Sequence, residues 1–282
     1  TKALTLLVLC VVARAMVTPQ KRVLVVGGSG FVGQEVCKIA VRRGFIVKSL
    51  SRRGINPDDS DDLLNQVVWT SGDATDLNVV TEALKDTDCV VHAAGLLFDI
   101  ESGLANYNKI VSGSGSVPGD ESTYDAITRK TAFNTISAIQ NMNQNRFPNP
   151  FASEAPSFPF AFVSAAEAGW PEVSYGEQVE ALAPSWLVKY LAAKRSVEAE
   201  LAGESKIRPI IYRPSLIWNW KKLDVLPVIP IFNAASALGV PFVDRTVRVE
   251  TIAGAIVAGL EDEQCTGVMR FTEMEALSSR VV

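Results

Sequence analysis

The stretch Lys21–Gly33, KRVLVVGGSGFVG, decides the fold of this 282-residue chain. Two basic residues precede an apolar run, Val23–Val26, and the glycines that follow, Gly27, Gly30 and Gly33, have GxxGxxG spacing. Apolar residues then recur at helical spacing, so the stretch predicts a buried strand, a tight turn and a helix. Such glycines allow a sharp bend, close approach of the backbone to a pyrophosphate, and helix packing against the strand. The alternative is a glycine-rich turn without a ligand.

Composition excludes several classes of function. A hydrophobic content of 48% and a charged content of 21% are typical of a globular protein. The net charge of −4 gives no reason to expect a nucleic-acid partner. Four cysteines without CxxC spacing predict neither a zinc site nor a disulfide framework. The single histidine, His92, cannot build a multi-histidine site, so no metal is expected.

Residues 1–20 have the pattern of a targeting segment. Lys2 precedes an apolar run over 3–13, and small residues flank Arg14. This pattern suits a signal peptide and therefore secretory entry. The absence of acidic residues before Glu35 suits an organelle transit segment equally, either mitochondrial or plastid.

Strand and helix signals alternate from Lys21 to residue 212. Strands are predicted at 23–26, 45–50, 66–70, 89–94, 158–164 and 207–212, and helices after Gly33 and at 76–85, 123–142 and 184–202. This alternation predicts an α/β fold, a doubly wound parallel sheet (Rossmann fold) with helices on both faces. We expect a nucleotide-binding domain over 21–215. Residues 216–282 would form a small C-terminal cap that completes the same domain, with elements near 226–238 and 251–260.

Two loops interrupt the alternation. Residues 112–119, SGSGSVPG, follow the fourth strand, and residues 145–159 are rich in proline. The first loop leaves the carboxyl end of a strand, where doubly wound sheets bind ligands. It is interpreted either as a mobile substrate loop or as a surface insertion.

The end of the second strand indicates the cofactor. An NAD site usually carries a carboxylate there, which binds the ribose 2′-hydroxyl. This chain instead has Ser51, Arg52 and Arg53. Guanidinium groups suit a 2′-phosphate, so the sequence favours NADP(H) over NAD(H). A solvated basic turn is the alternative.

Several motifs together resemble the short-chain dehydrogenase/reductase superfamily in its extended or atypical branch. The glycine turn resembles that branch's cofactor turn, and Asp73 its adenine contact. Ser164 ends the fifth strand where the family has its serine, and Tyr190-Leu-Ala-Ala-Lys194 matches its YxxxK motif. The resemblance covers residues 22–260. It implies that the nucleotide contacts Gly27, Ser29, Gly30, Phe31, Val32, Gly33, Ser51, Arg52, Arg53, Asp73, Ala74, Ala93, Ala94, Gly95, Lys194 and Pro214.

The motif residues Ser164, Tyr190 and Lys194 suit proton transfer. Tyrosine normally loses its proton near pH 10, and a lysine four residues later lies on the same helix face. The ammonium would favour the phenolate and lower the pKa of the tyrosine. Tyr190 could then exchange a proton with a substrate oxygen while the cofactor moves a hydride. Ser164 would bind the same oxygen. Tyrosine and lysine at this spacing also arise by chance on a basic helix face.

Within the superfamily, the chain most resembles the group of the complex I nucleotide-binding accessory subunit and its coenzyme-Q-synthesis-associated relatives. TYDAITRKTA opening the predicted helix 123–142 and VRVETIA at 247–253 carry this resemblance. The first hypothesis, based on the presence of Ser164, Tyr190 and Lys194, is an oxidoreductase acting on a small or prenylated carbonyl or alcohol, including a quinone-related one. A second hypothesis is a non-catalytic, nucleotide-holding assembly protein of an organelle membrane complex, with a mitochondrial location. A third, a sugar-nucleotide epimerase or dehydratase, ranks last because the predicted cap is small for a nucleotide-sugar.

Overall fold

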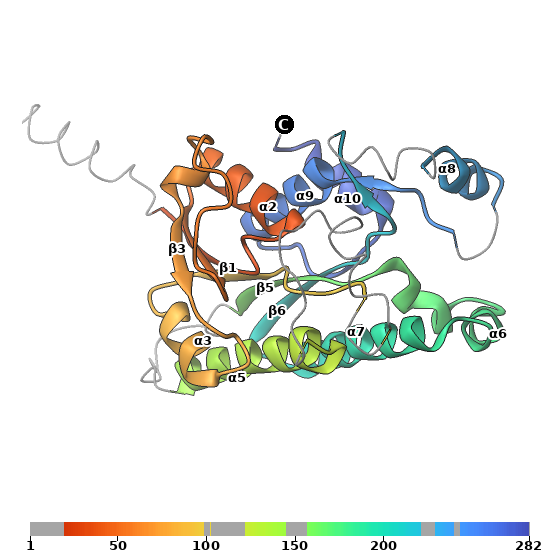
Figure 1. Ribbon diagram of the computed structural model, residues 1–282, viewed down its shortest axis with the longest axis horizontal. Helices are drawn as coiled ribbons and strands as arrows, with labels where there is room; N and C mark the ends of the chain where they lie inside the picture. The colour runs from red at the N-terminus through yellow and green to blue at the C-terminus, as the bar shows by residue number, and fades with distance from the viewer. Residues whose placement is uncertain are drawn as a thin grey trace, which may run out of the picture.

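A parallel sheet forms the centre of the molecule. The computed structural model describes residues 20–98, 102, 122–144, 157–220, 229–239 and 243–281. Within them, seven strands follow the order β3-β2-β1-β4-β5-β6-β9, and every neighbouring pair is parallel (Figure 1). The predicted doubly wound sheet is therefore confirmed. Its strands are β1 (Arg22–Val26), β2 (Ile46–Ser51), β3 (Val68–Ser71), β4 (Cys89–His92), β5 (Phe158–Val163), β6 (Ile207–Tyr212) and β9 (Gly267–Met269).

Helices cover both faces of this sheet. In Figure 1, α2, α9 and α10 lie above it and α3, α5 and α7 below it. The helices of the upper layer are α2 (Phe31–Arg42), α9 (Val249–Glu261) and α10 (Phe271–Ser278). The helices of the lower layer are α3 (Leu77–Leu84), α5 (Thr131–Gln144) and α7 (Ser185–Gly203). A π-helical segment, η4 (Asp125–Lys130), leads directly into α5.

The first strand shows why this stretch determines the fold. Val23 and Val25 belong to the hydrophobic cluster under α2 and α9, whereas Leu24 and Val26 belong to the cluster under α5 and α7. All four side chains are buried. Because both faces of β1 are covered, its sequence is a continuous apolar run rather than an alternation of apolar and polar residues.

The C-terminal region differs from prediction. The helix expected near 251–260 is α9, which packs against α2 and β5 and is buried along most of its length. It therefore lies in a core layer, and the prediction that it forms part of a cap is wrong. β9 extends the main sheet beyond β6. Of the predicted cap elements, α8 (Ile229–Ala237) lies apart from the two layers in Figure 1.

The remaining elements are short. They are η1 (Leu64–Gln66), η5 (Ala166–Glu172), α6 (Gly176–Ala181) and the two-stranded sheet of β7 (Ile217–Trp218) and β8 (Val247–Arg248). No helix in the described part of the chain has both the length and the apolar content needed to cross a membrane. The predicted targeting segment, up to residue 19, and the predicted loops at 112–119 and 145–156 lie outside the described residues.

Strand register brings three strand ends together. Val26 of β1 is paired with Leu50 of β2 on one side and with His92 of β4 on the other. The sheet order reverses direction at β1, since β2 and β3 lie on one side of it and β4, β5 and β6 on the other. Ligands bind doubly wound sheets at such a switch point, outside the carboxyl ends of the strands.

Candidate nucleotide-binding site

The glycine turn is packed so tightly that side chains are excluded from it. Gly27 has a φ of +87°, and the Gly30 amide donates to the Gly27 carbonyl at 2.9 Å. A Cβ on Gly27 would lie 2.7 Å from the backbone nitrogen of Ala94, and one on Gly33 would lie 2.2 Å from the Gly27 oxygen. The turn therefore keeps its backbone bare where α2 begins, as binding of a pyrophosphate at a helix N-terminus requires.

A cavity of about 390 Å³ opens over this turn. It extends from the end of β2 to the segment after β4. Eleven of the sequence-predicted contact residues line it, namely Gly27, Ser29, Gly30, Ser51, Arg52, Arg53, Asp73, Ala74, Ala93, Ala94 and Gly95. The lining does not include the predicted Phe31, Val32, Gly33, Lys194 and Pro214.

Six further lining residues were not predicted from the sequence. They are Val26, Leu50, Gly72, Leu96, Ile127 and Thr131. Val26 and Leu50 are the apolar ends of predicted strands, so the strand pattern itself could have indicated them. Ile127 and Thr131 come from the helical segment that crosses the ends of the strands. Their position depends on how this segment packs, which local sequence does not reveal.

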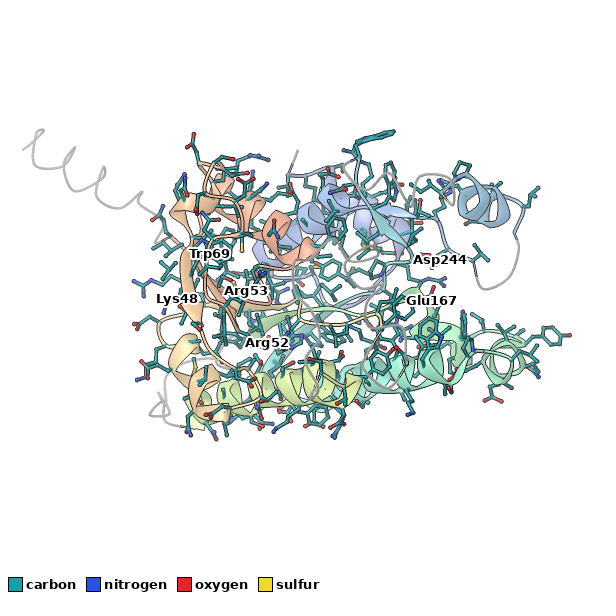
Figure 2. The ribbon with its side chains drawn as sticks, in the orientation of Figure 1. Lys48, Arg52, Arg53, Trp69, Glu167 and Asp244 are labelled. Atoms are coloured by element: carbon teal, nitrogen blue, oxygen red, sulfur yellow. The ribbon has the colours of Figure 1, made fainter. Side chains whose placement is uncertain are left out.

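The end of the cavity at β2 is basic. Arg52 and Arg53 are both exposed, and Figure 2 shows them between the layers, far from Glu167 and Asp244. The Arg52 guanidinium lies 3.4 Å from the hydroxyl of Ser122. Asp73 accepts a hydrogen bond from the Thr75 amide at 2.8 Å. Two guanidinium groups thus face a position where a phosphate can be held by charge-assisted hydrogen bonds.

Lys194 lies beyond the opposite end of the cavity and is 3% exposed. Its ammonium donates to the Val163 carbonyl at 2.7 Å and lies 4.9 Å from the ring centroid of Phe162. Burial lowers the pKa of Lys194 to about 8, partly offset by the negative charge of Glu198. This lysine can therefore change its protonation state near neutral pH.

Tyr190 lies next to this lysine. The Lys194 ammonium is 5.6 Å from the centroid of the Tyr190 ring, and the Tyr124 ring meets the Tyr190 ring edge-on, also at 5.6 Å. Burial, with a contribution from the negative charge of Glu167, raises the pKa of Tyr190 above its usual value. This direction is opposite to the one expected from the sequence, because burial is the largest influence on the pKa of Tyr190.

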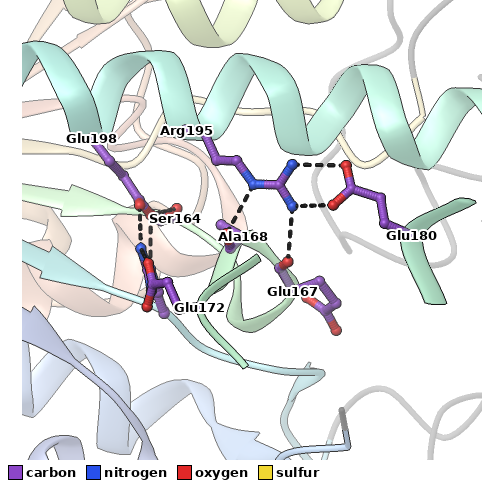
Figure 3. A network of polar contacts seen from close by, with 8 residues as sticks. Ser164, Glu167, Ala168, Glu172, Glu180, Arg195 and Glu198 are labelled. Carbon is purple, nitrogen blue, oxygen red and sulfur yellow. Dashed lines mark hydrogen bonds and ion pairs between the residues drawn. The ribbon is translucent and has the colours of Figure 1, made fainter. Parts of the chain in front are cut away.

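Ser164 participates in a buried ionic network. Its hydroxyl donates to the Glu198 carboxylate, which reaches over from α7 (Figure 3). Arg213 donates to both oxygens of Glu198, at 2.6 and 3.2 Å, and to both oxygens of Glu172, at 2.7 and 2.8 Å. Glu198 follows Lys194 by four residues, so helical spacing could have indicated it. The serine hydroxyl is thus bound by a carboxylate of α7, the helix that also carries Tyr190 and Lys194.

Arg195 has a structural role on the same helix. Its guanidinium forms two bonds to the carboxylate of Glu180, at 2.6 and 2.7 Å (Figure 3). It also donates to the carbonyl of Ala168 at 2.9 Å. Arg195 therefore ties α7 to α6 and to the η5 segment, which follows Ser164. A basic residue beside the YxxxK motif thus fixes the loop that follows β5.

His92 contacts a residue of the cavity wall, Thr131. It is fully buried, and its Nε2 lies 2.8 Å from the hydroxyl of Thr131. That hydroxyl donates to the Ile127 carbonyl at 2.7 Å, so it accepts from Nε2 and fixes the proton of His92 there. Burial lowers the pKa of His92 to about 3, so the ring is neutral at physiological pH. The histidine connects β4 to the helical segment that lines the cavity.

Comparisons with known proteins agree with this geometry. Residues 23–113 match the family model described as the NAD dependent epimerase/dehydratase family. MIOREX complex component 2 of Saccharomyces cerevisiae is 25% identical over 290 residues, covering 90% of this chain and 98% of the yeast protein. An uncharacterized chloroplastic protein of Arabidopsis thaliana is 24% identical over 279 residues, covering 93% of this chain and 78% of the plant protein.

Among solved structures, an oxidoreductase of the short-chain dehydrogenase/reductase family from Burkholderia thailandensis has the same fold. Its TM-score is 0.57 at 16% identity, with 90% of this chain and 91% of that chain covered. The family match therefore supports a nicotinamide dinucleotide as the cofactor.

Proposed function

We propose that this chain binds NADP(H) in a Rossmann domain of the short-chain dehydrogenase/reductase type and uses it as an oxidoreductase. The observation that carries the proposal is the cavity itself. It extends from two arginines, Arg52 and Arg53, over the glycine turn to the segment that contains Gly95. A Cβ placed on Gly95 would lie 3.4 Å from the ammonium of Lys194. The adenosine half would thus lie at the arginines and the nicotinamide half toward Lys194.

The arginines favour NADP(H) over NAD(H). Within the described residues, the cavity lining contains one carboxylate, Asp73, and its side chain already accepts a bond from the Thr75 amide. A 2′-phosphate placed beside Arg52 and Arg53 would gain two cationic partners. A 2′-hydroxyl would gain no carboxylate at the end of β2.

Tyr190 is the proposed acid and base of the reaction. The bound nucleotide would supply or accept the hydride, and Tyr190 would give a proton to a carbonyl oxygen or take one from an alcohol. Lys194, whose ammonium lies over the tyrosine ring at 5.6 Å from its centroid, would hold the nucleotide and the tyrosine in position. Burial raises the pKa of Tyr190, so the phenol holds its proton at neutral pH, the form that donates a proton to a carbonyl oxygen.

The surroundings of Tyr190 favour an apolar substrate. The Phe98 and Trp186 rings meet edge-on at 4.9 Å, and Tyr190 packs with Trp170 and Leu187 around a small hydrophobic cluster. Aromatic surfaces of this kind suit a flat or prenylated substrate, such as a quinone-related carbonyl. We place the protein in an organelle, the mitochondrion first, because its relatives include a yeast MIOREX component and a chloroplastic protein.

The test of turnover is oxidation of NADPH by a panel of quinones and carbonyls. Tyr190→Phe should lower the rate at least about 100-fold, in keeping with the usual contribution of an acid or base. Tyr175→Phe is the matched control, because Tyr175 is 76% exposed and should leave the rate unchanged. Equal rates for wild type and Tyr190→Phe would remove the catalytic role.

A second function deserves a separate test. The relative named as a complex component, together with a serine whose hydroxyl is bound by Glu198, favours a protein that holds the nucleotide for assembly. In that case wild type should bind NADPH, oxidise it with no member of the panel, and co-purify with a large organelle membrane complex. Turnover by a monomer would contradict this second function.

A further inference from the structure

The segment around α6 carries a cluster of exposed apolar side chains. Nine large apolar side chains are exposed in the described part of the chain, and three of them lie in this one segment, namely Val173, Tyr175 and Leu182. Leu182, directly after α6, is 88% exposed. Gly176 is the only buried residue of α6, and the helix lies at the end of the molecule furthest from β3 (Figure 1). Exposed apolar residues that gather in this way are typical of an interaction site.

A groove of about 430 Å³ lies between α6 and the start of α7. The chain positions on either side of Leu182 belong to its lining. Most of the lining is small or apolar and comes from Pro171, Ala181, Ala183 and Val188, with Glu177 and Glu180 as its acidic members. Leu182 and these six residues are called the α6 surface below. An apolar groove beside an exposed leucine suits the apolar face of a helix from another protein.

The free charge on the α6 surface is negative. Residues 165–188 contain four glutamates and no lysine, arginine or histidine. Glu180 is neutralised by Arg195, whose guanidinium binds both of its oxygens at 2.6 and 2.7 Å. Glu177 is exposed, and its carboxylate has no ion pair or hydrogen bond within the part of the chain that the structure describes. One uncompensated carboxylate therefore borders an apolar groove.

The backbone that presents this surface is tightly held. Tyr175, just before α6, has a φ of +65°, a conformation that costs strain in a residue with a side chain. A Cβ on Gly176 would lie 1.7 Å from the Trp170 carbonyl oxygen, so the turn packs directly on η5. Arg195 also donates to the Ala168 carbonyl at 2.9 Å, which fixes η5 and α6 to α7 (Figure 3). A surface that is already ordered loses little conformational freedom when a partner binds it.

We propose that the α6 surface binds a partner protein through a helical segment that has apolar side chains on one face and a lysine or arginine beside them. The apolar side chains would fill the groove and cover Leu182, and the basic residue would pair with Glu177. Charge complementarity favours this partner over a second copy of the chain, which would bring the same free carboxylate from both sides. It also disfavours an anionic membrane surface. The inference goes beyond the proposed function and does not depend on it.

A peptide library tests what this surface binds. Random peptides of about 15 residues, a length at which helices begin to form, would be displayed on phage and selected on the full chain. The selected peptides should carry apolar residues at helical spacing together with lysine or arginine. In fluorescence anisotropy with the tightest of them, Leu182→Ser should lower the affinity about 10-fold or more, the loss expected for an apolar contact of this size.

A charge exchange tests the role of Glu177. Glu177→Lys should weaken binding of the selected peptide about 5-fold or more, because like charges then meet at the interface. The same peptide with its basic residue changed to glutamate should bind Glu177→Lys more tightly than it binds wild type. Such a reversal requires the two charges to be neighbours, since a general attraction between a basic peptide and an acidic protein does not produce it.

Two matched variants serve as controls. Leu238→Ser changes another leucine that is 82% exposed, and Glu275→Lys makes the same change of charge at an exposed position of α10. Both should bind the selected peptide with wild-type affinity. Leu182→Ser should keep the Tm of wild type, because its side chain is exposed and makes little contribution to the fold.

Several results would overturn the proposal. One is the selection of no peptide, and another is the selection of peptides that bind Leu182→Ser as tightly as wild type. Sedimentation with vesicles of phosphatidylcholine and phosphatidylglycerol that Leu182→Ser abolishes would identify a lipid surface as the occupant instead. A dimer in analytical ultracentrifugation that the same variant dissociates would identify a second copy of the chain.

Discussion

The hydroxyl of Ser164 donates a hydrogen bond to the carboxylate of Glu198, the same carboxylate that Arg213 binds through two nitrogens. The serine expected to face a substrate is thus part of a buried ionic network. The two carboxylates that Arg213 binds differ in their exposure, because the side chain of Glu198 is 9% exposed and that of Glu172 is 62% exposed. This difference allows the contribution of each pair to be separated.

We expect Glu198→Gln to lower the free energy of unfolding by about 2–3 kcal/mol, because it leaves the buried guanidinium of Arg213 undercompensated. Glu172→Gln removes the exposed partner of the same arginine and should cost less than about 1 kcal/mol. Urea unfolding of both variants at pH 7 measures the difference. Losses of equal size would show that the buried pair does not dominate the network.

A second pair of residues tests the glycine turn. Gly27 and Gly44 have nearly the same backbone conformation, with φ of +87° and +84°. A Cβ on Gly44 would meet no atom within 4 Å, whereas one on Gly27 would collide with the backbone of Ala94. Gly44→Ala should therefore cost only the strain of a positive φ, about 1–2 kcal/mol.

Gly27→Ala should cost more in unfolding free energy than Gly44→Ala, and it alone should abolish dinucleotide binding. Urea unfolding and calorimetric titration of the two variants provide the comparison. If both variants bound the dinucleotide with wild-type affinity, the close approach at this turn would have no role in binding.

The fold could be predicted from the sequence because its signals are local. The apolar run of β1, the glycine turn and the capping residue Asp76, whose side chain accepts from the Asn78 amide, all act over a few residues. The sequence contained a sign that α9 belongs to the core and not to a cap. Residues Ile252–Leu260 are apolar or small on every side, and a helix that is apolar all round is buried in a core.

The site was less predictable because its details depend on contacts between distant segments. The pairing of Arg213 with Glu198 joins the residue after β6 to α7, and the position of Thr131 in the cavity wall depends on a π-helical turn that cannot be recognised in the hydrophobic pattern. The direction in which the pKa of Tyr190 shifts could not be predicted, because it depends on how deeply the side chain is buried. Conversely, Arg52 and Arg53 could be found in advance because a strand end has a fixed place at a switch point.

The arginines at the end of β2 lead to a prediction about cofactor choice. Arg52→Gln and Arg53→Gln should each weaken NADP⁺ binding about 10- to 100-fold, the usual value of a charge-assisted hydrogen bond. Neither substitution should change the affinity for NAD⁺, because NAD⁺ lacks the 2′-phosphate. Lys48→Gln is the control, because Lys48 lies on the same strand and its ammonium donates to the Lys85 carbonyl at 2.7 Å. If the affinities for NADP⁺ and NAD⁺ fell by the same factor, the arginines would not bind the 2′-phosphate.

The buried ammonium of Lys194 predicts a pH dependence of stability. Burial lowers its pKa from 10.5 to about 8 in the folded protein. Between these values the unfolded chain holds a proton that the folded chain has lost, so the contribution of Lys194 to the free energy of unfolding rises with pH. The gain should be about 3 kcal/mol between pH 7.5 and 10.5, and it should be absent below pH 7. Because other groups titrate in this window, the quantity to measure is the difference between wild type and Lys194→Met in urea unfolding at each pH. A difference that stayed constant across the window would show that Lys194 keeps its ordinary pKa in the folded protein.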